Sequence, residues 1–257
     1  MLRSLALSLA LAAPALAQPL TTDRPDFTES PTAVAPGTIQ LEAGTRFGYD
    51  ATTAQGNDLE TASVSAPQAL VRVGLRPGLE LRLGAPTFSA ARTEVTGPMA
   101  QTINASGWTD PSVGAKAELR PVSGWDLGVI AQATLPVGEL SQGVVVPSVI
   151  VTAGREVRPG LSVGVQGEAE YVPLARLSEA QRTTLAGVLV AGYELTERIG
   201  TFGEVRVVSA LSGAAARTQL HHGYTFGVTD DLQLDARVGT TVNGEDLFGG
   251  VGIAARF

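Results

Sequence analysis

The chain has 257 residues, with 18 basic side chains against 25 acidic ones and no cysteine. A hydrophobic content of 44% excludes a disordered chain, and the lack of cysteine excludes a disulfide scaffold and a thiolate zinc site. The net charge is -7 and the cations are scattered singly, which excludes a nucleic-acid surface.

The first 17 residues, MLRSLALSLALAAPALA, have the pattern of a secretory signal peptide. Arg3 precedes an apolar run from Leu5 to Ala13, and small residues stand at Ala15 and Ala17. The run is too short to span a bilayer. Cleavage before Gln18 would yield an exported protein.

Residues 18–37 form a polar segment that is predicted to lie at the periplasmic mouth of the structure that follows. It contains the stretch TTDRPDFTES, whose proline and charges do not favour a strand. Its charged side chains are candidates for a plug: Asp23, Arg24, Asp26 and Glu29.

From residue 38 onward, apolar and polar residues alternate. In TIQLEAGTRFGY, for example, Ile39 and Leu41 alternate with Gln40 and Glu42. Successive side chains of a strand point to opposite faces, so one face is apolar and the other carries the charges. The pattern predicts twelve strands, at 38–49, 64–75, 79–86, 109–119, 125–135, 148–157, 161–171, 183–195, 199–208, 218–228, 232–239 and 247–257.

Two kinds of connection alternate between these strands. Five are tight, such as the RPG turns at Arg76–Gly78 and Arg158–Gly160, in which proline and glycine suit a hairpin. Six are longer and polar, at 50–63, 86–108, 136–147, 172–182, 209–217 and 240–246. The only helical pattern is a short turn, Leu177–Arg182, inside one of them.

An even number of strands with alternating short and long connections is typical of an outer-membrane barrel of a Gram-negative bacterium. We therefore predict an all-β fold: a single up-and-down antiparallel transmembrane β-barrel of about twelve strands over 38–257, favoured over a soluble sandwich. The aromatic residues expected at the membrane interfaces are Phe47, Tyr49, Trp125, Tyr171, Tyr193, Tyr224, Phe226 and Phe257.

Three motifs resemble a known family. TDRPDFTESP, VAPGTIQLEAG and GWTDPSVGAKAEL are similar to the family named for the MetA pathway of phenol degradation, and the resemblance runs over most of the mature chain. It implies an outer-membrane β-barrel with a transport role, and it supplies no substrate. The terminal Phe257 on the last strand resembles the signal that is read by the outer-membrane assembly machinery.

The polar face of the strands would line the lumen with charges of both signs. The candidates are Glu42, Arg46, Arg72, Glu80, Arg82, Lys116, Glu118, Glu168, Glu204, Arg206, Asp235 and Arg237. Because the signs nearly balance, this wall predicts either weak ion selectivity or cross-strand salt bridges that partly close the lumen.

The polar N-terminal segment would then lie beside this charged wall. We expect Arg24 to pair with wall carboxylates such as Glu42 or Glu118, and the acidic residues of the segment to meet Arg46, Arg72 or Arg82. Such a segment would narrow or gate the pore. The alternative is a solvated leader that only delays the first strand.

The sequence therefore predicts passive passage of a small, unidentified solute through a narrow mixed-charge lumen. A non-conducting structural or interaction barrel, with 86–108 as its contact surface, is the alternative. An outer-membrane hydrolase comes third, since the adjacent His221 and His222 lie on opposite faces and no serine is suitably placed beside His222. No enzyme activity, cofactor or metal is expected, and the expected partners are outer-membrane lipid, the assembly machinery and the solute.

Overall fold

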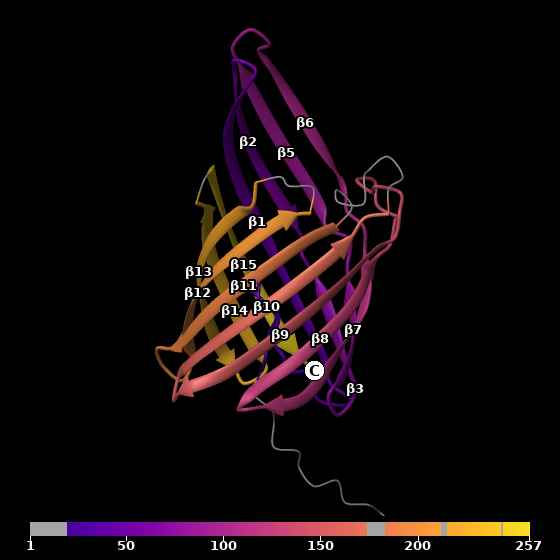
Figure 1. Cartoon of the computed structure of the whole chain (residues 1–257), viewed down its shortest axis with the longest axis vertical. Helices are drawn as coiled ribbons and strands as arrows, with labels where there is room; N and C mark the ends of the chain where they lie inside the picture. Colours follow the sequence, from indigo (N-terminus) through magenta and orange to yellow (C-terminus); the bar gives the residue numbers. More distant parts are fainter. Residues whose placement is uncertain (1–19, 174–182, 212–214, 243) are drawn as a thin grey trace, which may run out of the picture.

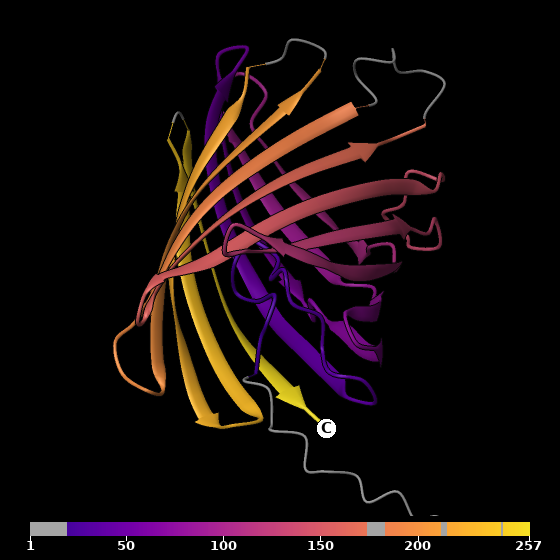
Figure 2. The ribbon, with the colours of Figure 1, turned by 60° about the horizontal axis from the view of Figure 1, so that its bottom comes forward.

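The computed structural model describes residues 20–173, 183–211, 215–242 and 244–257. They form one antiparallel sheet of 15 strands rolled into a barrel, seen in Figures 1 and 2. Within these ranges, no helix is long and apolar enough to cross a membrane. The signal peptide and the helical turn predicted at Leu177–Arg182 fall outside the described residues.

The strands are β1 Ile39–Ala54, β2 Asn57–Ala66, β3 Leu70–Arg76, β4 Leu79–Gly84, β5 Phe88–Thr96, β6 Gln101–Trp108, β7 Ser112–Val122, β8 Trp125–Thr134, β9 Val146–Arg158, β10 Leu161–Tyr171, β11 Thr183–Glu194, β12 Ile199–Ala210, β13 Arg217–Thr229, β14 Leu232–Thr241 and β15 Glu245–Arg256.

Pairing between the first and last strands closes the barrel. β15 pairs with β1 from Gln40 opposite Arg256 to Ala51 opposite Glu245. Three wall strands are broken, into β2 and β3, β4 and β5, and β6 and β7, and the breaks contain Pro67, Pro86 and Pro111. Proline has no N–H to donate and cannot continue a ladder. With each broken strand counted once, the wall is the closed 12-stranded barrel that the alternation predicts.

The short turns lie at the end of the barrel that carries the C-terminus, and the longer connections lie at the other end (Figure 1). In the two RPG turns, Gly78 and Gly160 have φ angles of 72° and 76°, which glycine adopts without strain. The alternation of connections was therefore predicted correctly from the sequence.

Two segments predicted as loops are strands instead. Residues 50–63 continue β1 and β2, and 86–108 form the hairpin of β5 and β6, which rises above the rest of the barrel (Figure 1). Nearly every side chain of β6 is exposed. Alternation disappears here because neither face packs against lipid or a filled lumen, while the Thr, Val and Ile content still favours strands.

The distribution of polar residues is the reverse of that in a soluble domain. Arg72, Lys116, Glu42 and Glu80 are completely buried, whereas large apolar side chains such as Leu189, 64% exposed, cover the outside. A wall that is apolar outside and charged inside suits a barrel surrounded by lipid. Of the aromatic residues expected at the interfaces, six are among the exposed hydrophobic side chains: Phe47, Tyr49, Tyr193, Tyr224, Phe226 and Phe257.

The last residue closes the barrel seam. The N–H of Phe257 donates to the carbonyl of Ile39 at 2.8 Å, and its side chain is 77% exposed. Its role as an assembly signal stays a prediction.

Candidate functional site

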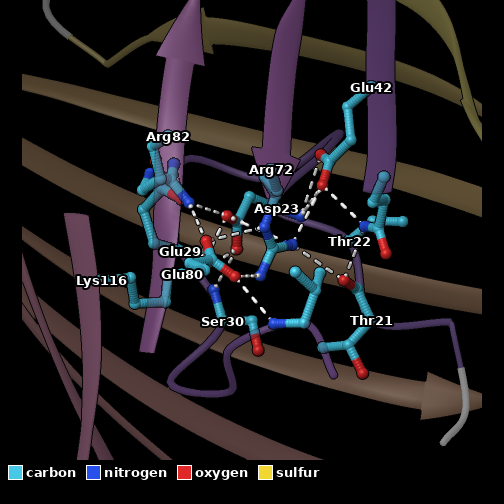
Figure 3. A network of polar contacts seen from close by, with 12 residues as sticks. Thr21, Thr22, Asp23, Glu29, Ser30, Glu42, Arg72, Glu80, Arg82 and Lys116 are labelled. Atoms are coloured by element: carbon cyan, nitrogen blue, oxygen red, sulfur yellow. Dashed lines mark hydrogen bonds and ion pairs between the residues drawn. The ribbon is translucent and has the colours of Figure 1, made fainter. Parts of the chain in front are cut away.

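The segment Thr21–Ala35, which we call the plug, runs through the lumen before β1 begins (Figures 2 and 3). Its hydrogen-bonding partners come from the inner faces of many strands, including Glu42 on β1, Arg72 on β3, Lys116 on β7 and Glu204 on β12. The plug therefore contacts the wall nearly all the way round. Residues 18–37 were predicted at the barrel mouth, and the described part of this segment reaches well inside.

Asp23 is the centre of the plug's charged contacts (Figure 3). Its carboxylate accepts bonds from Lys116 Nζ at 2.8 and 2.9 Å and from Arg82 Nη1, and lies 3.3 Å from Arg72 Nη1. Its own N–H donates to Glu42 Oε2 at 3.0 Å. Burial acts to raise the pKa of Asp23, but Arg72, Lys116 and Arg82 outweigh it and hold this pKa well below its usual range.

The guanidinium of Arg72 links the wall to the plug. It forms a two-pronged pair with Glu80, with both N···O distances 2.9 Å, and donates to Glu42 Oε1 at 3.0 Å. It also donates to the plug carbonyls of Thr21, at 2.9 Å, and Thr32, at 3.0 Å. These contacts use all five N–H donors that arginine possesses. The wall charges are therefore paired among themselves as well as with the plug.

Wall carboxylates hold the main chain of the plug. Glu204 accepts from the N–H groups of Phe27 and Thr28 at 2.8 and 2.9 Å, and from the Thr28 hydroxyl at 2.6 Å. Glu80 accepts from the Val34 N–H at 2.8 Å, and Glu118 from the Ala33 N–H at 2.6 Å. A carboxylate that accepts several such bonds is a strong anchor, because charge-assisted hydrogen bonds are about twice as strong as neutral ones.

The pairings predicted for the plug are right in part. Asp23 meets Arg72 and Arg82, and Glu29 meets Arg82 at 2.7 Å, as expected. Arg24 lies beside a wall carboxylate, as predicted, but this is Asp235 and not Glu42 or Glu118, the two named as examples. Arg24 lies 3.6 Å from Asp235 and packs over Gly44 and Gly252, which face each other across the β1–β15 seam and leave room for its guanidinium.

Asp26 also departs from expectation. No described hydrogen bond or ion pair joins its carboxylate to Arg46, Arg72 or Arg82. Burial and the neighbouring Glu204 carboxylate raise the pKa of Asp26 well above its usual range. It lines a cavity of about 460 Å³ beside the plug at the end of the barrel with the short turns, together with Glu156, Tyr193 and Glu194.

All of the predicted lumen residues lie on the inner face of the wall. Nearest the plug are Glu42, Arg72, Glu80, Arg82, Lys116, Glu118, Glu204, Asp235 and Arg237. Of the other three, Arg206 lies with its guanidinium 5.1 Å from the centre of the plug's Phe27 ring, and Arg46 and Glu168 lie elsewhere on that face. Arg206 pairs with Glu168 at 3.4 Å, and the guanidinium of Arg46 lies 5.0 Å from the centre of the Phe248 ring.

An aromatic cluster on the inner wall was missed by the sequence analysis. The ring of Phe27 lies 4.7 Å from that of His221 and 5.8 Å from that of Phe248, and Phe202 lies 5.2 Å from His221. A signal was present, because Phe202 has the strand parity of Glu204, and Phe248 that of Arg256. His222 faces outward, as expected, against the ring of Tyr224 at 5.0 Å.

The fold and the site define a class: a closed antiparallel barrel of the outer-membrane type with a polar N-terminal plug in its lumen. More particularly, the chain belongs to the family described as "Putative MetA-pathway of phenol degradation", whose model matches residues 22–257. The resemblance noted in the sequence is thereby confirmed. No curated protein matches the sequence.

Solved outer-membrane barrels share the fold. The COG4313 outer membrane channel from Pseudomonas putida F1 superimposes with a TM-score of 0.64 at 15% identity, covering 88% of this chain and 97% of that one. The NanC porin gives 0.52 at 10% identity, covering 84% and 98%. The KdgM porin in complex with disordered oligogalacturonate gives 0.51 at 11% identity, covering 86% and 99%. At these identities the likeness concerns the fold.

Proposed function

We propose that this protein is an outer-membrane channel through which a small solute passes passively when the plug leaves the lumen. The apolar outer surface supports a place in the outer membrane, and the porins and the channel among its structural neighbours support passive transport. The solute would cross a narrow lumen that carries both signs of charge.

The observation that carries this proposal is the way the wall charges are paired. Arg72 contacts Glu80 and Glu42 at 2.9 and 3.0 Å, and Arg82 contacts Glu80 at 3.0 Å, all within the wall. When the plug departs, these cations keep carboxylate partners, so its exit does not strand isolated buried charges. No wall strand has to break, because the plug precedes β1 in the chain.

Deleting residues 21–30 tests the proposal. This change removes Asp23 and the anchors to Glu204 while leaving every wall strand intact, so we expect frequent discrete steps in planar-bilayer conductance where the full-length mature chain is mostly closed. Heat-dependent gel migration verifies that the barrel has formed. Unchanged conductance would overturn the gating role, and a folded barrel that never conducts in either form would overturn the channel.

A non-conducting interaction barrel is the second candidate, and the hairpin of β5 and β6 favours it. Among the described strands, β6 pairs only with β5, so its other edge is open except at its last residue, Trp108, whose carbonyl accepts from the Leu140 N–H at 3.0 Å. An open strand edge can accept a strand from another chain. Arg92 faces Asn104 and Ala91 faces Ala105 in the ladder, so a two-residue turn could replace 92–104 and keep the register.

This shortened hairpin separates the two candidates. A channel should keep its conductance steps in planar bilayers, because the hairpin lies beyond the plugged part of the lumen. Loss of those steps, with the barrel still folded, would contradict the expectation that the channel conducts without the hairpin. Loss of a binding partner with unchanged conductance would assign the hairpin to recognition.

A further inference from the structure

The wall contacts of Phe27 resemble those of a bound ligand. Its ring lies beside those of His221 and Phe248, and the guanidinium of Arg206 lies 5.1 Å from its centre. Its main-chain N–H donates to Glu204 Oε2 at 2.8 Å. A single site on the wall thus contacts the faces and edges of an aromatic ring and also binds a nitrogen through a carboxylate.

This site, which we call the Phe27 pocket, consists of Glu204, Arg206, His221 and Phe248, with Phe202 behind them. Contacts among wall residues hold it together without the plug. His221 Nδ1 lies 2.7 Å from Glu204 Oε2, and the His221 ring lies 5.2 Å from Phe202 and 5.8 Å from Phe248. The pocket should therefore persist when the plug leaves.

Glycine makes room for one of these rings against the wall. A Cβ at Gly223 would lie 2.5 Å from ring atoms of Phe202, closer than real side chains approach. The rings of Phe202 and Phe248 are consequently 6% and 4% exposed. The backbone of β13 thus helps to shape the pocket.

Departure of the plug would leave polar atoms of this pocket without partners. Glu204, 3% exposed, would lose the N–H groups of Phe27 and Thr28 and the Thr28 hydroxyl, keeping only His221. Within the described residues, His221 Nε2 is already buried without a hydrogen-bond partner. A buried polar group without a partner is costly, so the vacated pocket favours a ligand that donates to it.

The geometry of phenylalanine specifies that ligand. In Phe27, two carbons, Cβ and Cα, separate the ring from the nitrogen that Glu204 binds. An arylethylamine has the same ring, the same two carbons and a nitrogen that is positively charged, and a charged donor bonds a carboxylate more strongly than an amide does. Arg206 would oppose this charge weakly, because Glu168 lies 3.4 Å from it.

We propose that the Phe27 pocket binds a primary amine carried two carbons from an aromatic ring, and that Phe27 is the built-in competitor that occupies it in the closed state. This assignment names a solute class for the proposed channel, and access to the pocket rests on the plug movement proposed above. A solute of this class would compete with the plug for Glu204.

Calorimetric titration of the refolded protein in detergent with 2-phenylethylamine tests this assignment. Phe27→Ala should bind the amine at least about tenfold more tightly than the natural chain, because one buried aromatic contact no longer competes. The chain lacking 21–30 should bind it as well, which guards against a folding defect peculiar to Phe27→Ala. Phenylacetate, which has a carboxylate in place of the amine, should bind neither variant.

A second substitution tests whether Glu204 binds the nitrogen of the amine. Phe27→Ala combined with Glu204→Gln should lose at least about tenfold in affinity for the amine, as expected when a charged pair becomes neutral. The assignment is overturned if folded Phe27→Ala binds 2-phenylethylamine no better than the natural chain, or binds phenylacetate equally well. The titration needs no conduction, so binding without conductance would overturn the channel alone, and conductance without binding would overturn this assignment alone.

Discussion

Asp23→Asn should open the channel. The substitution keeps the shape of the side chain and removes a carboxylate that contacts Arg72, Arg82 and Lys116 together, so that Lys116 keeps only the Glu80 carboxylate, 3.8 Å away, among the described ion pairs. Breaking a buried ion pair by removing one partner costs on the order of 3–5 kcal/mol. At 1.4 kcal/mol for each factor of ten, the equilibrium between seated and withdrawn plug should shift by roughly a hundredfold or more.

The measurement is the fraction of time that single channels spend open in planar bilayers. Glu29→Gln should have a smaller effect, because Glu29 has one cation partner, Arg82, and is 21% exposed. Glu94→Gln is the matched control, since it removes an exposed pair with Arg92, 63% and 56% exposed, far from the plug. If Asp23→Asn channels stay as closed as those of Glu94→Gln, the network around Asp23 does not hold the plug.

A disulfide between the plug and the wall should lock the open variant shut. The natural chain has no cysteine, so an introduced pair has no competitor. Pro31 Cγ lies 3.5 Å from the place where a Cβ at residue 154 would stand, and no atom lies closer to that place. Pro31 Cβ is bonded to this Cγ, so the two Cβ atoms stand near the separation of about 3.5–4.5 Å found in disulfides, and Pro31→Cys with Gly154→Cys should form one.

The lock is best tested in the Asp23→Asn chain. We expect oxidised channels with both cysteines to remain closed and to open again on reduction, because a covalent bond holds the plug although its charge network is broken. Chains with either cysteine alone should stay open under oxidation, which excludes an effect of the substitutions themselves. Steps that persist after the disulfide has formed would show that solutes pass without movement of the plug.

The wall could be predicted because its rule is local. Alternation places Glu42, Arg72 and Lys116 on one face whatever their partners are, and proline with glycine marks the tight turns. Where both faces meet solvent, as in β5 and β6, the same rule fails because no contrast remains between them. The breaks at Pro67, Pro86 and Pro111 were not predicted, although proline cannot donate to a ladder.

The contacts of the plug could be predicted only in part. Asp23 and Glu29 met expected arginines, since opposite charges confined in one lumen tend to pair. Arg24 pairs with Asp235 because two glycines, far apart in the chain, leave space for its guanidinium at the seam between β1 and β15. The main-chain bonds to Glu204 and Glu118 had no sequence signal, because every residue except proline carries a main-chain N–H group.

The sequence by itself determined the class of this protein: an all-β chain whose alternating strands and turns make a twelve-stranded barrel with charges inside. These features follow from the direction in which each side chain leaves its own strand. Only the tertiary structure decided that the plug fills the lumen, that wall carboxylates bind its main chain, and that Phe27 occupies an aromatic pocket. Those contacts join residues such as Asp23 and Glu42, 19 positions apart, and Phe27 and Glu204, 177 positions apart, and depend on the register and closure of the whole barrel.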